Sequence, residues 1–133
     1  MTDTASTPSW PPGISAITLF VEDLDATEQF YREVFGLPVV FQDDNSAVFA
    51  FGTTLINLLK TTAAPALIAP ARVARADAGS RLQLTLPVSD VDAMCEELTA
   101  RGVTLLNGPV NRPWGIRTAS FRDPAGHIWE IAG

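Results

Sequence analysis

Histidine and cysteine, which often carry acid–base or metal chemistry, each occur only once in this sequence. His127 is the only histidine and Cys95 the only cysteine. One imidazole cannot build a multi-histidine metal site, and one thiol can form neither an intrachain disulfide nor a thiolate cluster. We therefore expect no redox chemistry, and we interpret His127 as a turn residue, with an acid–base or metal role as the alternative. Glu130 is then the remaining candidate for a catalytic residue.

An internal repeat predicts the elements that must position these side chains. The pattern apolar-x-apolar-x-Val-x-Asp-apolar-Asp occurs at residues 17–25 and again at 84–92. Each copy precedes a helical segment, over 25–36 and 92–102, that opens with a capping aspartate and closes with glycine. Short β-type runs follow each helix, so each half predicts strand, helix, strand, strand, strand.

The β-type runs and turn signals give expected boundaries. Strands are expected at 39–42, 47–51 and 55–60 in the first half and at 103–106, 117–122 and 128–131 in the second, with turns at 43–45, 52, 107–109 and 123–126. We expect a flexible N-terminal arm over 1–12, a first module over 13–60, a linker over 61–80 and a second module over 81–133. A chain of 133 residues can bury one good core, so these parts should form one compact domain.

Two sets of motifs resemble the opening and closing modules of the vicinal oxygen chelate superfamily, which includes glyoxalases, bleomycin-resistance proteins and dioxygenases. Val21-Glu22-Asp23-Leu24, Phe30-Tyr31 and Gly36-Leu37 resemble its opening module; Pro113-Trp114-Gly115 and Asp123-Pro124-Ala125-Gly126-His127 resemble its closing module. The resemblance implies an α+β fold, in which two βαβββ modules form a curved, mostly antiparallel half-barrel around one cavity. It also implies a homodimer.

Four metal ligands line this cavity in the metal-dependent members that the sequence resembles. Their positions fall on Ala16, Asn57, Gln83 and Glu130. A catalytic divalent metal needs about three strong nitrogen, oxygen or sulfur donors, and only Glu130 is a standard ligand. We therefore expect no metal and no other cofactor, and keep a divalent metal as the disfavoured alternative.

Side chains alternate along a strand, so residues flanking the expected core positions should face the cavity. Ile17, Leu19 and Val21 should point to the helices, as should Leu82, Leu84, Leu86 and Val88. The polar residues on the cavity side are Thr18, Asn57, Gln83, Thr85 and Glu130. Trp114 is expected to cover the cavity or to plug the dimer seam. Glu130 either contacts a cationic ligand or pairs with an arginine such as Arg117.

Charge and hydropathy limit the partners. The formal net charge is -6, which opposes binding to a phosphate backbone and suits an uncharged or cationic small molecule. Apolar runs such as 14–21 are far shorter than the roughly 20 residues of a membrane span. The first 12 residues do not resemble a secretory signal. We expect a cytoplasmic protein that binds neither nucleic acid nor membrane.

The leading functional hypothesis is a metal-free, bleomycin-resistance-like protein, which binds a small amphipathic or cationic molecule and sequesters it as an antibiotic is sequestered. The alternative is an enzyme of the same superfamily: a metal-dependent lyase, epimerase or dioxygenase, for example one like glyoxalase I. A regulatory domain without catalysis is a third possibility.

Overall fold

The computed structural model describes residues 8–133 and contains two similar α+β modules. The first comprises β1 (Ala16–Val21), α1 (Leu24–Phe30), a π-helical turn η1 (Tyr31–Phe35), β2 (Val39–Gln42), β3 (Ser46–Phe51) and β4 (Thr54–Lys60). The second comprises β5 (Gln83–Pro87), α3 (Val91–Ala100), β6 (Leu105–Asn111), β7 (Arg117–Arg122) and β8 (Ile128–Ala132). The predicted order of strand, helix and three strands is therefore confirmed in both halves.

Each module folds its four strands into a mixed sheet. The strand orders are β1-β4-β3-β2 and β5-β8-β7-β6. The first strand of each module pairs parallel with the last, and the other neighbours pair antiparallel. The last strand thus lies inside each sheet, between the first and third strands.

Both helices begin one residue earlier than the repeat indicated, because the capping aspartates are Asp23 and Asp90. Each has extended backbone angles, and its carboxylate accepts a hydrogen bond from a backbone N–H in the first turn, Ala26 or Ala93, at 3.0 Å. That geometry defines an N-cap residue. The expected starts at Asp25 and Asp92 are wrong. The carboxylates of Asp25 and Asp92 instead lie in the first turns of the two helices, next to the positive end of each helix dipole.

The turn expected at residues 107–109 is also wrong, since β6 continues through it. Asn107 pairs with Ser120 and Val110 with Thr118, so one extra residue is accommodated as a bulge. Gly108 has φ +88°, and its backbone packs tightly against that of β7. A strand can therefore pass through a glycine and proline pair when a bulge absorbs the irregularity.

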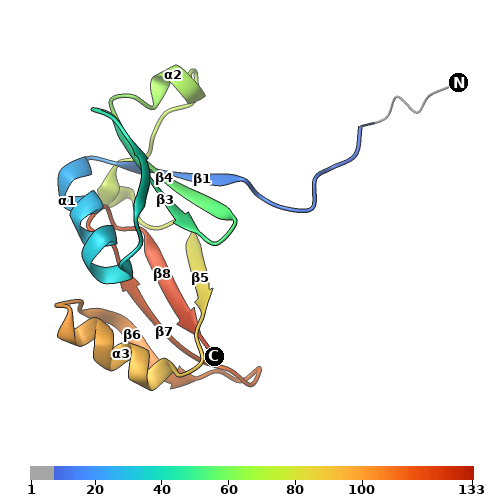
Figure 1. The fold of residues 1–133 in the computed structure, drawn as a ribbon, viewed down its shortest axis with the longest axis vertical. Coiled ribbons are helices and arrows are strands. Elements are labelled where there is room, and N and C mark those ends of the chain that lie inside the picture. The colour runs from blue at the N-terminus through green and yellow to red at the C-terminus, as the bar shows by residue number, and fades with distance from the viewer. Residues whose placement is uncertain (1–7) are drawn as a thin grey trace, which may run out of the picture.

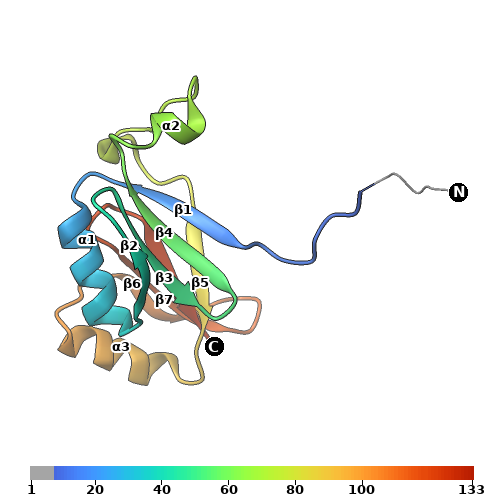
Figure 2. The same cartoon turned by 45° about the horizontal axis from the view of Figure 1, so that its top comes forward.

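The linker leaves the body of the molecule before it returns to β5. It contains a single helical turn, α2 (Pro65–Ile68), and a 3₁₀ turn, η2 (Ala76–Ala78). Figures 1 and 2 show α2 standing apart from both sheets. Of the expected N-terminal arm, residues 1–7 lie outside the described residues, and residues 8–12 run away from the body as an exposed segment.

One hydrophobic core joins the two modules through their helix-covered faces. Leu19, Val21, Phe49, Phe121 and Trp129 belong to it, and the rings of Phe51 in β3 and Trp129 in β8 stack with centroids 5.1 Å apart. Leu82 does not join this face as predicted: it is 41% exposed, since it precedes β5. Figures 1 and 2 show α1 and α3 on the same side of the sheets.

The opposite faces of the two sheets turn away from this shared core, because successive side chains of a strand point to opposite sides. Ala16, Gln83 and Thr85 are exposed accordingly. The two sheets are open, so the predicted α+β fold of two modules is confirmed. Within residues 8–133, no helix has the length and hydropathy needed to cross a membrane.

Candidate functional site

The first candidate site lies on the outer face of the first sheet. Thr18 in β1 and Asn57 in β4 are register partners, and the Asn57 amide donates a long hydrogen bond of 3.4 Å to the Thr18 hydroxyl. The Asn57 Oδ1 atom is buried and has no partner. A buried acceptor without a hydrogen bond costs about 1–3 kcal/mol, so this atom is poised to accept one from water or a ligand.

The second candidate site occupies the equivalent place in the second sheet. Thr85 in β5 and Glu130 in β8 are register partners, and the Thr85 hydroxyl donates to Glu130 Oε1 at 2.9 Å. Ser120 in β7 is the register partner of Glu130 on the neighbouring strand. Its side chain is buried, with 3% exposure, and its hydroxyl has no hydrogen-bond partner. Sequence reasoning missed Ser120, although its alternation with the core residues Ala119 and Phe121 placed it on this face.

Four of the six predicted ligand-binding residues therefore form two pairs, and the six do not form one cluster. Gln83 is exposed at the start of β5, two residues before Thr85 on the same face. Trp114 is 69% exposed at the tip of the β6–β7 hairpin, where no aromatic contact in the described chain holds its ring. Nor does any hydrogen bond among residues 8–133 join the Thr18–Asn57 pair to the Thr85–Glu130 pair.

The four positions that correspond to metal ligands do not fit a divalent metal. They supply one methyl group, two neutral amides and one carboxylate, from Ala16, Asn57, Gln83 and Glu130. Glu130 already accepts a hydrogen bond from Thr85. In the part of the chain that the structure describes, no three His, Cys, Asp or Glu side chains lie close enough to hold an ion.

Glu130 is not paired with Arg117, which corrects one of the two interpretations of this carboxylate. The Arg117 guanidinium instead makes a two-pronged contact with Asp92 of α3, with a shortest distance of 2.9 Å. Asp92 thereby holds Arg117 against the helix side of the second module. Among the described residues, Glu130 forms no ion pair.

A buried hydrogen-bond chain connects the two modules, and sequence reasoning missed it. The Trp129 indole donates to the Tyr31 hydroxyl at 2.9 Å, and that hydroxyl donates to Asp123 Oδ2 at 2.8 Å. Burial, then the charge of Asp123 and the hydrogen bond to it, raise the pKa of Tyr31 far above its usual range, while the bond from Trp129 lowers it. Tyr31 is thus held as a neutral donor to Asp123.

Asp123 also holds the one histidine of the chain. Its carboxylate accepts hydrogen bonds from the backbone N–H groups of Ala125 and His127, both at 2.9 Å, and lies 3.0 Å from His127 Nδ1. The predicted turn position of His127 is confirmed, but the imidazole is more tightly held than a surface turn residue would be. Burial raises the pKa of the Cys95 thiol, which disfavours the reactive thiolate form.

Two open mixed sheets built from βαβββ units, each with a helix packed on one face, define a protein of the vicinal oxygen chelate class. The chain belongs to the glyoxalase/bleomycin resistance protein/dioxygenase superfamily, whose family model matches residues 13–131. It is 34% identical over 119 residues to a Bacillus subtilis (strain 168) protein named "Uncharacterized protein YraH", covering 86% of this chain and 93% of that protein.

Solved structures show the same fold. A glyoxalase/bleomycin resistance protein/dioxygenase from Nocardioides is 25% identical with a TM-score of 0.83, covering 96% of this chain and 85% of that one. A lactoylglutathione lyase from Agrobacterium tumefaciens is 26% identical with a TM-score of 0.74, covering 92% of this chain and 93% of that one. These relatives support the fold prediction, and their names include a lyase and a glyoxalase/bleomycin resistance protein/dioxygenase.

Proposed function

We propose that this protein is a metal-free binding protein for a small amphipathic cation, with Glu130 as the group that recognises the positive charge. The observation that carries the proposal is the state of this carboxylate. Glu130 lies on an open face, is bonded only to the neutral Thr85 hydroxyl, and belongs to no ion pair of the described chain. A ligand cation would supply the missing partner, and the net charge of -6 would attract it.

One further polar atom on the outer face of each sheet could take part in recognition. Ser120 Oγ and Asn57 Oδ1 are both buried without partners, one on each sheet. A ligand with amide or hydroxyl groups could satisfy them and relieve the cost of leaving them unpaired. Small-molecule sites typically combine a few such groups with apolar walls.

Within one chain the outer faces of the two sheets turn away from each other. A homodimer would bring an outer face of one chain against an outer face of the other. Val40 and Phe41 on β2 and Val110 on β6 are exposed in the single chain. Their exposure supports a dimer, because edge strands with exposed apolar side chains are usually covered by another chain. We expect light scattering at micromolar concentration to give twice the 14.2 kDa mass of one chain. A mass of one chain at that concentration would contradict the dimer.

The ligand class is tested by calorimetric titration with bleomycin and with benzamidine, a planar aromatic cation. We expect Glu130→Gln to weaken binding about tenfold, since a hydrogen bond to a charged group contributes about 1.5 kcal/mol or more. We expect Trp114→Ala to weaken it about three- to twelvefold by loss of stacking.

The control for Glu130→Gln is Glu96→Gln, which removes one carboxylate from the exposed face of α3 and should leave affinity unchanged. Equal affinities in wild type and Glu130→Gln would refute the proposal.

The alternative is a metal-dependent enzyme, favoured by the similarity to the lactoylglutathione lyase. We expect Zn, Ni, Co, Mn and Fe salts to leave the melting temperature unchanged, because a tight site would stabilise by RT ln(1 + [L]/Kd). In the dimer proposed above, which would bring Ala16 of one chain close to Gln83 and Glu130 of the other, the double variant Ala16→His, Gln83→His would add two imidazoles to Glu130 and is the positive control. A saturable rise of several degrees in wild type, lost in Glu130→Gln, would favour the enzyme.

A further inference from the structure

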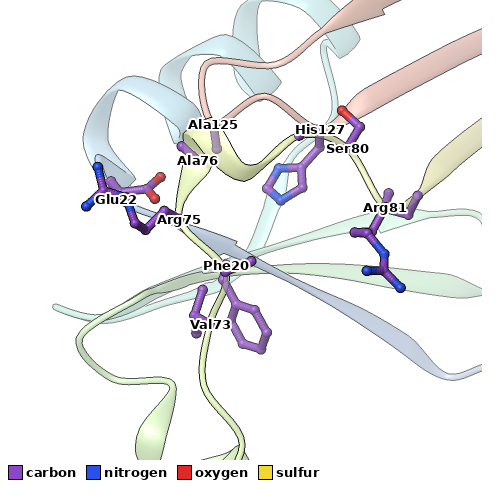
Figure 3. A pocket seen from close by; sticks show the side chains of 12 residues that line it. Phe20, Glu22, Val73, Arg75, Ala76, Ser80, Arg81, Ala125 and His127 are labelled. Atoms are coloured by element: carbon purple, nitrogen blue, oxygen red, sulfur yellow. The ribbon is translucent and has the colours of Figure 1, made fainter.

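A pocket of about 200 Å³ lies beside the linker (Figure 3), and none of the six predicted ligand-binding residues lines it. The lining consists of Phe20 of β1, Glu22 just after it, residues 73–76 of the linker, residues 79–82 that lead into β5, and Ala125 and His127 of the turn before β8. Phe20, Val73 and Leu82 give it an apolar wall. An apolar cavity of about 150 Å³ can take up benzene, so this pocket has room for one aromatic ring and a small polar group.

The imidazole of His127 points into this pocket (Figure 3). Its Nδ1 atom faces Asp123, which is 4% exposed and acts as an acceptor for Tyr31 and for two backbone N–H groups. Nδ1 must therefore be the nitrogen that donates to Asp123. Nε2 is the ring nitrogen left for a ligand, and it becomes a second donor in the imidazolium form. The carboxylate fixes both the orientation of the ring and the role of each nitrogen.

The charges around the pocket are unevenly compensated. Arg75 is paired with Asp77 at 3.0 Å, and in Figure 3 it lies beside Glu22. Arg81 lies on the opposite side of the pocket in the same view and makes no ion pair within residues 8–133. The guanidinium of Arg81 thus borders the space without an ion pair, while the carboxylate of Glu22 lies on the other side of the pocket. A single negative charge next to Arg81 fits this arrangement, whereas a dianion would be repelled more strongly by Glu22.

We propose that this pocket is a second ligand site, which binds a small aromatic monocarboxylate. The ring lies against Phe20, Val73 and Leu82, and the carboxylate contacts the guanidinium of Arg81 and accepts a hydrogen bond from Nε2–H of His127 in its imidazolium form. Charge-assisted hydrogen bonds of this kind are stronger than those between neutral groups. The site uses none of the residues assigned to the cation site, so either proposal can fail without the other.

The test is an NMR titration of the full chain with benzoate, followed on the imidazole signals. Because His127 is the only histidine, these signals report on the pocket without assignment ambiguity. We expect benzoate to shift them in a saturable manner and benzamide, the neutral isostere, to leave them unchanged. Phenyl phosphate should bind more weakly than benzoate. Tighter binding of phenyl phosphate, or no shift with benzoate, would overturn the proposal.

Two variants locate the carboxylate. Arg81→Gln should weaken benzoate binding about fivefold, the effect of losing a partly exposed ion pair. Arg72→Gln is the matched control: it removes the same charge from the same linker at a position outside the pocket and should leave affinity unchanged. His127→Asn should abolish binding detected by calorimetry; if it does not fold, Arg81→Gln still decides. Equal affinities for wild type and Arg81→Gln would refute the assignment.

Discussion

Replacing Asp123 with alanine is expected to lower the free energy of unfolding by about 3–5 kcal/mol, the usual range when one partner of a buried charged network is removed. The carboxylate is buried and accepts hydrogen bonds from Tyr31, from two backbone N–H groups and from His127. Alanine would leave these donors without an acceptor, and each buried donor contributes its own desolvation penalty. Urea unfolding at one fixed protein concentration measures the change.

Asp43→Ala is the matched control, because Asp43 makes similar turn hydrogen bonds at the surface. Its carboxylate accepts from the backbone N–H groups of Asn45 and Ser46, both at 2.8 Å, and these bonds lower its pKa. Water can replace them, so we expect a loss of only about 1 kcal/mol. If Asp123→Ala were no more destabilising than Asp43→Ala, the chain from Trp129 through Tyr31 to Asp123 would not stabilise the contact between the modules.

Gly108→Ala is expected to destabilise the protein by about 2–4 kcal/mol, the sum of a left-handed backbone penalty and a steric overlap. Gly108 has φ +88°, and an added Cβ would lie 2.5 Å from the Thr118 carbonyl oxygen and 2.7 Å from the Ala119 Cα. Both are backbone atoms of β7, so a side chain rotation cannot relieve the overlap. The displaced strand would also carry Ser120 away from Glu130.

Gly115→Ala separates the two contributions. Gly115 has φ +99° in the β6–β7 hairpin, but nothing lies within 4 Å of an added Cβ. The backbone penalty alone should cost about 1–2 kcal/mol. Thermal unfolding of both variants compares them directly. Equal losses would mean that β6 and β7 can separate at the bulge, so that close packing at Gly108 is unimportant.

The site could be predicted only in part. Alternation along β1, β4, β5 and β8 placed Thr18, Asn57, Thr85 and Glu130 on one face of each sheet, and the structure joins them in two hydrogen-bonded pairs. The pairing of Arg117 with Asp92 and the isolation of Glu130 were beyond this reasoning. The ion-pair partner of a long side chain such as Arg117 depends on the face of the sheet over which the side chain extends. Alternation along the strand does not predict that direction.

The sequence by itself determined the architecture of each module, because the evidence for it is local. The repeat at residues 17–25 and 84–92, with periodic apolar residues and capping aspartates, requires only neighbouring residues to form a strand followed by a helix. The helix starts were misplaced by one residue, and the turn at 107–109 was wrong, because a cap and a bulge depend on backbone angles that composition does not fix.

Only the tertiary structure decided how the modules meet. Tyr31 reaches Asp123 and Trp129 across more than 90 residues of sequence, and these contacts pack the helix-covered faces together and turn the polar faces outward. They also orient His127 toward the linker pocket, a site for which the sequence held no spacing signal. Such contacts form because a buried hydroxyl, indole and carboxylate must satisfy one another in three dimensions, and no local pattern records that requirement.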